Sequence, residues 1–233
     1  MRPVRGQLLH MLQTVANALG DDLRGRLVFV GGCTTALFIT DEITLEGVRM
    51  TDDVDLIVNL AGYSDWPKLQ DQLRDRGFTE AQDEVICRMR LDGLKVDFMP
   101  DDPKILGFTN RWYAMGIESA ISYALTDALN IKILTPPLFV ATKLEAYLGR
   151  GKGDLLASRD LEDILLIVDG RPEIVAEIQA ADLDVRTFIA SEIRALLEHP
   201  YFDHLIDGNI KGPEGRVGIV FKRLGMMADA GLN

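Results

Sequence analysis

The chain has 233 residues, of which 47% are apolar and 26% are charged, and its formal net charge is -11. The apolar fraction is sufficient for a folded core. The negative net charge argues against non-specific electrostatic binding of nucleic acid over a large surface, because such binding depends on Lys and Arg side chains that contact phosphates. No apolar run reaches the roughly 20 residues of a membrane-spanning helix, and the first residues are too polar for a secretory signal. We therefore expect a cytoplasmic protein in which Cys33 and Cys87 are buried thiols.

The first elements predict a strand that ends in a pair of glycines. Apolar residues at helical spacing indicate an amphipathic helix over residues 5–19, which Gly20 ends. The β-branched and aromatic run over 26–30 is typical of a buried strand, and it leads directly into Gly31-Gly32. Residues 34–39 are expected to begin a helix, so the order is strand, glycine turn and helix N-terminus.

The glycine pair is the first candidate binding site. Glycine has no Cβ, so a ligand can approach the backbone of Gly31 and Gly32 closely, and N–H groups at the start of a helix point toward an anion. Phosphate is the obvious anion. The alternative is that the pair forms only a tight turn, which is the commoner role of two adjacent glycines.

Two carboxylates follow on the next predicted strand, over residues 51–58. Alternate residues of a strand share a face, so Asp53 and Asp55 point the same way, while Asp52 points to the opposite face. Two like charges at close range are unfavourable without a cation between them, and Mg2+ prefers oxygen ligands. The alternative is a solvated pair of turn residues.

A third carboxylate, Asp97, lies on a predicted hairpin. Residues 85–91 and 94–99 form its strands, and Asp92-Gly93 is the typical two-residue turn between them. An acidic residue in an otherwise apolar strand costs stability unless it is paired or ligates a cation. Asp97 is therefore the third predicted ligand, with a solvent-facing position as the alternative.

The rest of the chain is increasingly helical. In chain order, we expect a helix over 66–76, a loop over 103–112, a helix over 117–124 and a strand over 128–134. Helices then follow over 137–149, 158–168, 172–181, 185–197 and 217–230. The fold class is α+β, with a small mixed sheet flanked by helices in residues 1–134 and an all-helical part in residues 135–233.

In this order and spacing, the motifs resemble the nucleotidyltransferase superfamily of polymerase-β-like minimal enzymes. The likeness rests on Val30-Gly31-Gly32 with Ala36-Leu37, on the stretch 49–58 with its Asp-x-Asp, and on Asp97. The stretches 136–147 and 158–164 resemble the Lys-x-x-Ala and Arg-Asp-x-x-Asp signatures of the abortive-infection (AbiEii-like) toxins of that superfamily. Where many members have Ser after the glycine pair, this chain has Cys33, so the hydroxyl contact to phosphate would fall to Thr34 or be missing.

The resemblance implies an enzyme that transfers NMP from an NTP to an acceptor, which would be tRNA, a protein or a small molecule. A cognate antitoxin would be a partner, and no membrane is involved. The implied catalytic residues are Asp53, Asp55, Asp97, Lys143 and Asp160; Asp53, Asp55 and Asp97 would bind Mg2+ or Mn2+; Gly31, Gly32, Thr34 and Lys143 would bind the nucleotide.

Each of these roles has an alternative. A lysine such as Lys143 is more often a solvated residue on a helix surface, and Asp160 and Asp163 have the positions of first-turn acids that the helix dipole favours. At the level of the whole protein, the alternative is a non-catalytic relative that binds a nucleotide or a partner.

The metal site carries a geometric condition. The carboxylate oxygens must converge to within roughly 5 Å, the reach of a bridging hard cation. They must also lack permanent arginine partners.

Overall fold

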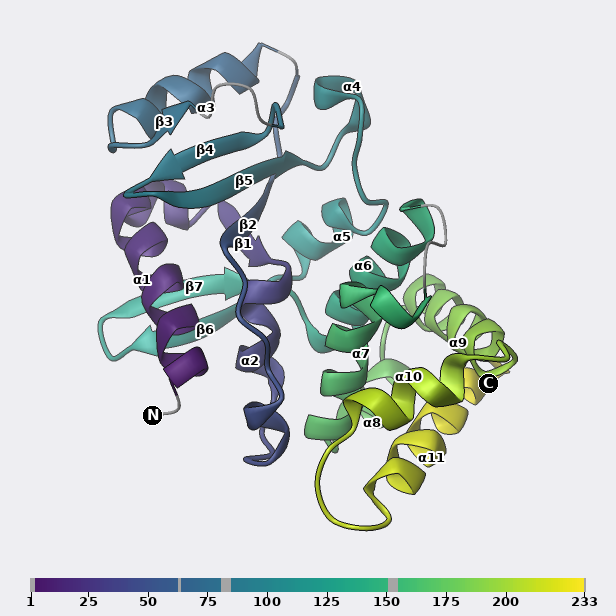
Figure 1. The fold of residues 1–233 in the computed structure, drawn as a ribbon. Helices are drawn as coiled ribbons and strands as arrows, with labels where there is room; N and C mark the ends of the chain where they lie inside the picture. The colour runs from purple at the N-terminus through teal and green to yellow at the C-terminus, as the bar shows by residue number, and fades with distance from the viewer. Residues whose placement is uncertain (1–2, 63, 81–84, 151–154, 233) are drawn as a thin grey trace. The chain divides into compact units, whose positions relative to one another are not determined.

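The computed structural model describes residues 3–62, 64–80, 85–150 and 155–232 (Figure 1). The chain divides into two compact units: the first holds Met1–Thr34 and Met50–Thr135, and the second holds Thr35–Arg49 and Pro136–Asn233. A mixed sheet and a helical C-terminal part confirm the predicted α+β class. Among the described residues, no helix combines the length and the apolar character that crossing a bilayer requires.

A mixed sheet forms the centre of the first unit. In the described residues it has seven strands, in the order β3-β4-β5-β2-β1-β7-β6. The strands are β1 (Leu27–Val30), β2 (Asp53–Val58), β3 (Thr79–Glu80), β4 (Arg88–Leu91), β5 (Leu94–Pro100), β6 (Ile121–Thr126) and β7 (Leu129–Ile133). Strand β2 runs parallel to β5 and antiparallel to β1, which in turn runs parallel to β7. The two aspartate-bearing strands are therefore direct neighbours.

Helices cover this sheet. Helix α1 (Pro3–Arg24) packs against β1, β2 and β7, and Gly20, with φ 65° and ψ 173°, interrupts it before a last turn. Helix α3 (Asp65–Arg74) buries Leu69 and Leu73, as the sequence predicts. Helix α5 (Tyr113–Glu118) packs against β1 and β2.

The predicted hairpin is confirmed. Strands β4 and β5 pair antiparallel, and the turn residues Asp92 and Gly93 have φ values of 50° and 84°. Positive φ at both positions is what a two-residue turn of this kind requires. The turn therefore fixes which residues of β4 and β5 face each other.

Two predictions in the next stretch are wrong. The helix expected over 117–124 is strand β6 from Ile121 onward, and the loop expected over 103–112 contains the short helix α4 (Pro103–Leu106). Strand β6 is an edge strand that is largely exposed, so its apolar residues lack the clear alternation of a half-buried strand. Asp102 caps the N-terminus of α4, because its side chain accepts a hydrogen bond from the Lys104 backbone N–H.

The second unit is helical. It consists of α2 (Thr35–Phe38), α6 (Pro136–Gly149), α7 (Arg159–Gly170), α8 (Ile174–Gln179), α9 (Leu183–Leu197), α10 (Phe202–Asn209) and α11 (Arg216–Asp229), with short 3-10 turns over Thr44–Glu46, Leu155–Ala157 and Ala230–Leu232. Helices α6, α7, α8, α9 and α11 confirm the predicted helices. The sequence analysis missed α10, which lies between two breaks in the apolar pattern.

The stretch Thr35–Arg49 lies inside the range 1–134 but packs with the second unit. A hydrogen-bonded ion cluster attaches it to the C-terminal helices. Arg216 Nε donates to Asp169 Oδ1 at 2.6 Å and Nη2 donates to Asp41 Oδ1 at 2.5 Å, while Thr44 Oγ1 donates to Asp169 Oδ2 at 2.6 Å. The stretch Thr35–Arg49 is therefore a packed part of the second unit.

This cluster predicts a stability change in acid. The Thr44 backbone N–H, which donates to Asp41 Oδ1 at 2.8 Å, and Arg216 lower the pKa of Asp41 from 3.8 to about 2. A carboxyl whose pKa is lowered by folding stabilises the fold above pH 4, and that contribution is lost as the pH falls toward 2. Since Asp41 is one-third exposed, we expect it to contribute on the order of 1 kcal/mol.

Denaturant unfolding of the wild type and Asp41→Asn at pH 6, 4 and 2 measures this contribution. The stability difference between the two proteins should be largest at pH 6 and shrink between pH 4 and 2. A difference that is the same at all three pH values would contradict the assignment.

Candidate functional site

Strand pairing brings the three predicted acids together. Strands β2 and β5 pair in parallel with Asp55 directly opposite Asp97, and Asp53 lies two residues before Asp55 on the same face. One carboxylate oxygen from each of Asp53, Asp55 and Asp97 lies within 4.8 Å of the others. The distance condition for a bridging cation is therefore satisfied.

Gly31 makes room for one of these carboxylates. Its φ is 76°, a conformation that residues with a side chain rarely adopt, and Val30 before it pairs with Asp55 on β2. A Cβ at Gly31 would overlap Asp55 Oδ2 and would lie 2.8 Å from Asp55 Cγ. The space that the sequence analysis assigned to a ligand is thus used, at Gly31, by the Asp55 carboxylate.

Arg88 is the residue that sequence reasoning missed. It lies opposite Asp97 on β4, where its Nε donates to Asp97 Oδ1 and its Nη2 to Asp97 Oδ2, each at 2.7 Å. The two side chains are 17% and 12% exposed, so water screens this bidentate pair only weakly. Asp97 therefore has an arginine partner, and the second geometric condition is not met at this ligand.

The charge of the cluster remains suited to a divalent cation. Three carboxylates and one guanidinium give a formal charge of -3 + 1 = -2. Three oxygen donors at this spacing are the hard ligands that Mg2+ and Mn2+ prefer.

Cys33 and Cys87 are buried thiols that form no disulfide, as the sequence predicts. Burial and, next, the negative charges of Asp97 and Asp55 raise the pKa of Cys87 to about 12. Its thiol therefore stays protonated at neutral pH and is a poor metal ligand there. Cys33, at the position that departs from the family pattern, donates its S–H to the Val30 carbonyl at 3.3 Å.

The turn after the glycines is tighter than expected. Gly32–Thr34 forms a 3-10 turn and α2 is a single helical turn, so the helix expected over 34–39 offers little macrodipole to an anion. Thr34 is fully buried, and its Oγ1 donates to the Gly31 carbonyl at 2.9 Å. In this arrangement Thr34 holds the glycine turn in place rather than presenting its hydroxyl hydrogen to phosphate.

Lys143 and Asp160 lie in the second unit and are paired there. Lys143 Nζ lies 2.6 Å from Asp163 Oδ2 and 3.2 Å from Asp160 Oδ1, and the side chain is only 9% exposed. The alternative of a solvated surface lysine is therefore wrong. Asp163 is not merely a first-turn acid either, because it is 1% exposed and also pairs with Arg49 at 3.2 Å.

These residues form a chain of alternating charges between α6, α7 and the stretch that ends at Arg49. Arg150 pairs with the second oxygen of Asp160, and Arg49 Nε lies 3.8 Å from Glu162. Because Asp160 and Asp163 are three residues apart on α7, they share one face of the helix, which is the signal that could have identified Asp163 as a second partner. The ammonium of Lys143 is thus neutralised within its own unit.

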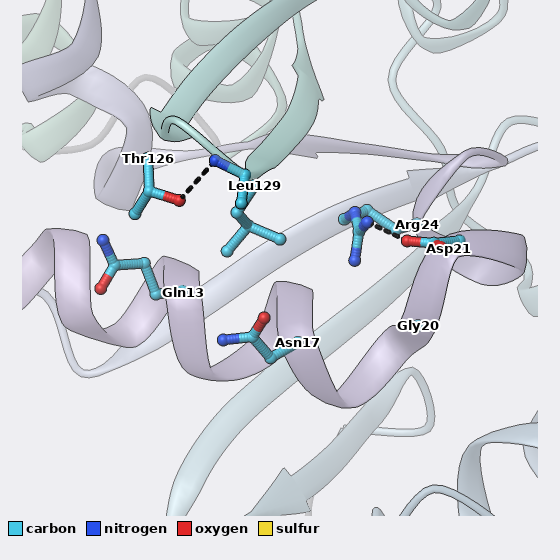
Figure 2. A pocket seen from close by; sticks show the side chains of 8 residues that line it. Gln13, Asn17, Gly20, Asp21, Arg24, Thr126 and Leu129 are labelled. Carbon is cyan, nitrogen blue, oxygen red and sulfur yellow. Dashed lines mark hydrogen bonds and ion pairs between the residues drawn. The ribbon is translucent and has the colours of Figure 1, made fainter.

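A separate open pocket in the first unit has a volume of about 480 Å³. Figure 2 shows the side chains that line it. Side chains of α1, including Gln13 and Asn17, line one wall, and the β6–β7 turn lines the other. Thr126 Oγ1 accepts a hydrogen bond from the Ala128 N–H at 3.3 Å in that turn. None of the predicted site residues lines this pocket, so the candidate site is defined by the acidic cluster.

Comparisons with known proteins assign no family to the chain. No protein-family model and no curated protein matches it. Among solved structures, it is similar to the crystal structure of JHP933 from Helicobacter pylori, with 14% identity over 98% of this chain and 92% of that one. The TM-score is 0.47, so this likeness assigns no function.

Replacing Gly31 by Ala should destabilise the protein through two effects. One is the cost of a side chain at positive φ, roughly 1–3 kcal/mol, and the other is the overlap with Asp55. Gly93→Ala is the matched control, because Gly93 also has positive φ but has open space at its Cβ position. Denaturant unfolding should show the larger loss for Gly31→Ala, and Asp55→Ala in the same chain should remove the excess. Equal losses for the two glycines would contradict the proposed contact.

Replacing Lys143 by Met should lower the free energy of unfolding by about 3–5 kcal/mol, because Asp160 and Asp163 would stay buried with less compensation. Lys222→Met, at an exposed position on α11, is the control and should change stability by less than about 0.5 kcal/mol. Denaturant unfolding of both variants measures the difference. A loss at Lys143 no larger than that at Lys222 would show that the pairs contribute little.

Proposed function

We propose that this chain is a Mg2+-dependent nucleotidyltransferase, which transfers NMP from an NTP to an acceptor: the acceptor hydroxyl attacks the α-phosphate of the NTP, the bond between the α- and β-phosphates breaks, and pyrophosphate leaves. The observation that carries the proposal is the convergence of Asp53, Asp55 and Asp97, from two neighbouring parallel strands, to within 4.8 Å. A nucleotidyl transfer has to neutralise the charge that develops on the triphosphate, and clustered carboxylates are the usual way a protein recruits cations for that purpose.

The acidic cluster fits the metal. Asp53, Asp55 and Asp97 offer hard oxygen donors, and with Arg88 they carry a net formal charge of -2. A bound Mg2+ or Mn2+ would supply electrostatic stabilisation of the phosphates and would favour ionisation of the acceptor hydroxyl.

The residues of the chain position this chemistry. Asp53 and Asp55 are fixed on one face of β2, and Gly31 leaves the space in which the Asp55 carboxylate lies. A carboxylate of the cluster would also accept the proton of the attacking hydroxyl. The catalytic roles of Lys143 and Asp160 stay predictions from the resemblance, since the two side chains pair with each other and with neighbouring charges of the second unit.

We further propose that the chain is AbiEii-like, with an antitoxin as its natural regulator. Support comes from the order of the glycine pair, the Asp-x-Asp and the Lys143 and Asp160 signatures. The net charge of -11 favours a small-molecule acceptor over tRNA, because binding tRNA needs local positive charge against its phosphates.

A non-catalytic relative is the second candidate function. The observation that favours it is the bidentate contact of Arg88 with Asp97, which engages both oxygens of one predicted ligand. In that case the protein would bind a nucleotide or a partner without transferring NMP.

Label transfer from α-32P-NTPs tests the two functions. Wild type, Asp55→Asn and Asp52→Asn would be incubated with Mg2+ and, separately, with total RNA, a protein extract and small hydroxyl compounds. Asp52→Asn is the matched control, because Asp52 is 73% exposed, precedes β2 and pairs with Lys95. We expect transfer by wild type and control, and a loss of at least about 100-fold in Asp55→Asn.

The other outcomes separate the candidates. NTP binding without transfer by the wild type would favour the non-catalytic relative. Equal transfer by the wild type and Asp55→Asn would place the activity outside the acidic cluster.

A further inference from the structure

We infer that Arg88 is a built-in counter-ion of the acidic cluster, and that a divalent cation binds there by displacing the Arg88 guanidinium from Asp97. This inference rests on the metal site of the proposed function. It deepens that proposal, because it names the residue that sets the affinity of the site for its cation.

The contact geometry is the first step of the argument. The guanidinium fork engages Asp97 Oδ1 and Oδ2 at 2.7 Å each, so it uses both oxygens that a cation would approach. A cation bound to all three carboxylates would lie beside a second full positive charge with little water between them. The two positive groups therefore compete for Asp97.

The electrostatics of the cluster is the second step. Asp55 and Asp97 are paired residues of neighbouring strands, and like charges directly opposite each other repel. In a protein without a bound cation, the Arg88 guanidinium relieves this repulsion at Asp97 through its two hydrogen bonds. Its low exposure makes the pair stronger than an ion pair on an open surface.

The strand register is the third step. Arg88 faces Asp97 in the β4–β5 ladder, and the Phe98 N–H donates to the Cys87 carbonyl at 2.8 Å next to this pair. The backbone therefore holds Arg88 in place, and the guanidinium has to leave Asp97 by side-chain rotation. Arg90 lies two residues further along the same face of β4, where the ladder places it opposite Lys95 and not opposite Asp97.

Mn2+ binding without nucleotide is the direct test. Calorimetric titration, with free Mn2+ counted by electron paramagnetic resonance, would compare wild type, Arg88→Gln and Arg90→Gln. Arg90→Gln is the matched control, because it removes the same charge from the same face of β4 without touching the Asp97 contact. We expect Arg88→Gln to bind Mn2+ at least about tenfold more tightly than the wild type, because the repulsion between the guanidinium and the cation is removed, and Arg90→Gln to change much less.

Thermal unfolding in EDTA and in Mn2+ provides a second readout. Arg88→Gln should have a lower Tm than the wild type in EDTA, because the carboxylates lose their counter-ion, and it should gain more from added Mn2+. Arg88→Lys retains the charge without the bidentate fork, so its Mn2+ affinity should lie between that of the wild type and that of Arg88→Gln. This variant preserves the test if Arg88→Gln fails to fold.

The outcomes distinguish this inference from the proposed function. Equal or weaker Mn2+ binding by both Arg88 variants would overturn the inference while leaving the metal site in place. Absence of binding in the wild type and in both variants would remove the metal site, and both proposals with it. Tighter binding in Arg88→Gln together with no NMP transfer by the wild type would support the inference and overturn the function.

Discussion

Repulsion between carboxylates is the constraint on which the first unit depends. The parallel pairing of β2 and β5 fixes Asp55 opposite Asp97, and Asp53 adds a third charge on the same face. Two neighbouring residues accommodate this charge. Gly31 has no Cβ where the Asp55 carboxylate lies, and Arg88 forms a bidentate pair with Asp97. Concentrating negative charge in this way is costly unless a positive group compensates it, as Arg88 does at Asp97 and as the proposed cation would do for the three carboxylates.

The second unit also places charge inside the protein but neutralises it internally. Lys143 lies between Asp160 and Asp163, and Arg216 lies between Asp169 and Asp41. Such pairs add less stability than apolar packing of the same volume, but removing one partner strongly destabilises the protein because the other charge stays buried without compensation. They therefore fix the relative positions of α6, α7, α11 and the stretch Thr35–Arg49 within the unit.

Local patterns predicted most elements of the fold and the acidic cluster, because strand alternation and the Asp92-Gly93 turn act over a few residues. The packing of Thr35–Arg49 with the second unit depends on contacts with residues far along the chain, such as Arg216, which no local pattern contains. Arg88 is a different case. Counting outward from the two-residue turn places it opposite Asp97, so the signal was present in the sequence and required only the register of the hairpin.

The parallel pairing of β2 with β5 also determines where the chain can accept insertions and deletions. The chain leaves β2 at Val58 and returns at Leu94 through a crossover that holds α3 and β3–β4, and loops of this kind accept insertions at small entropic cost. A single residue gained or lost within β5 would instead turn Asp97 to the opposite face of the sheet. Homologues of this chain should therefore differ in length along the crossover, while the spacing inside the two strands stays constant.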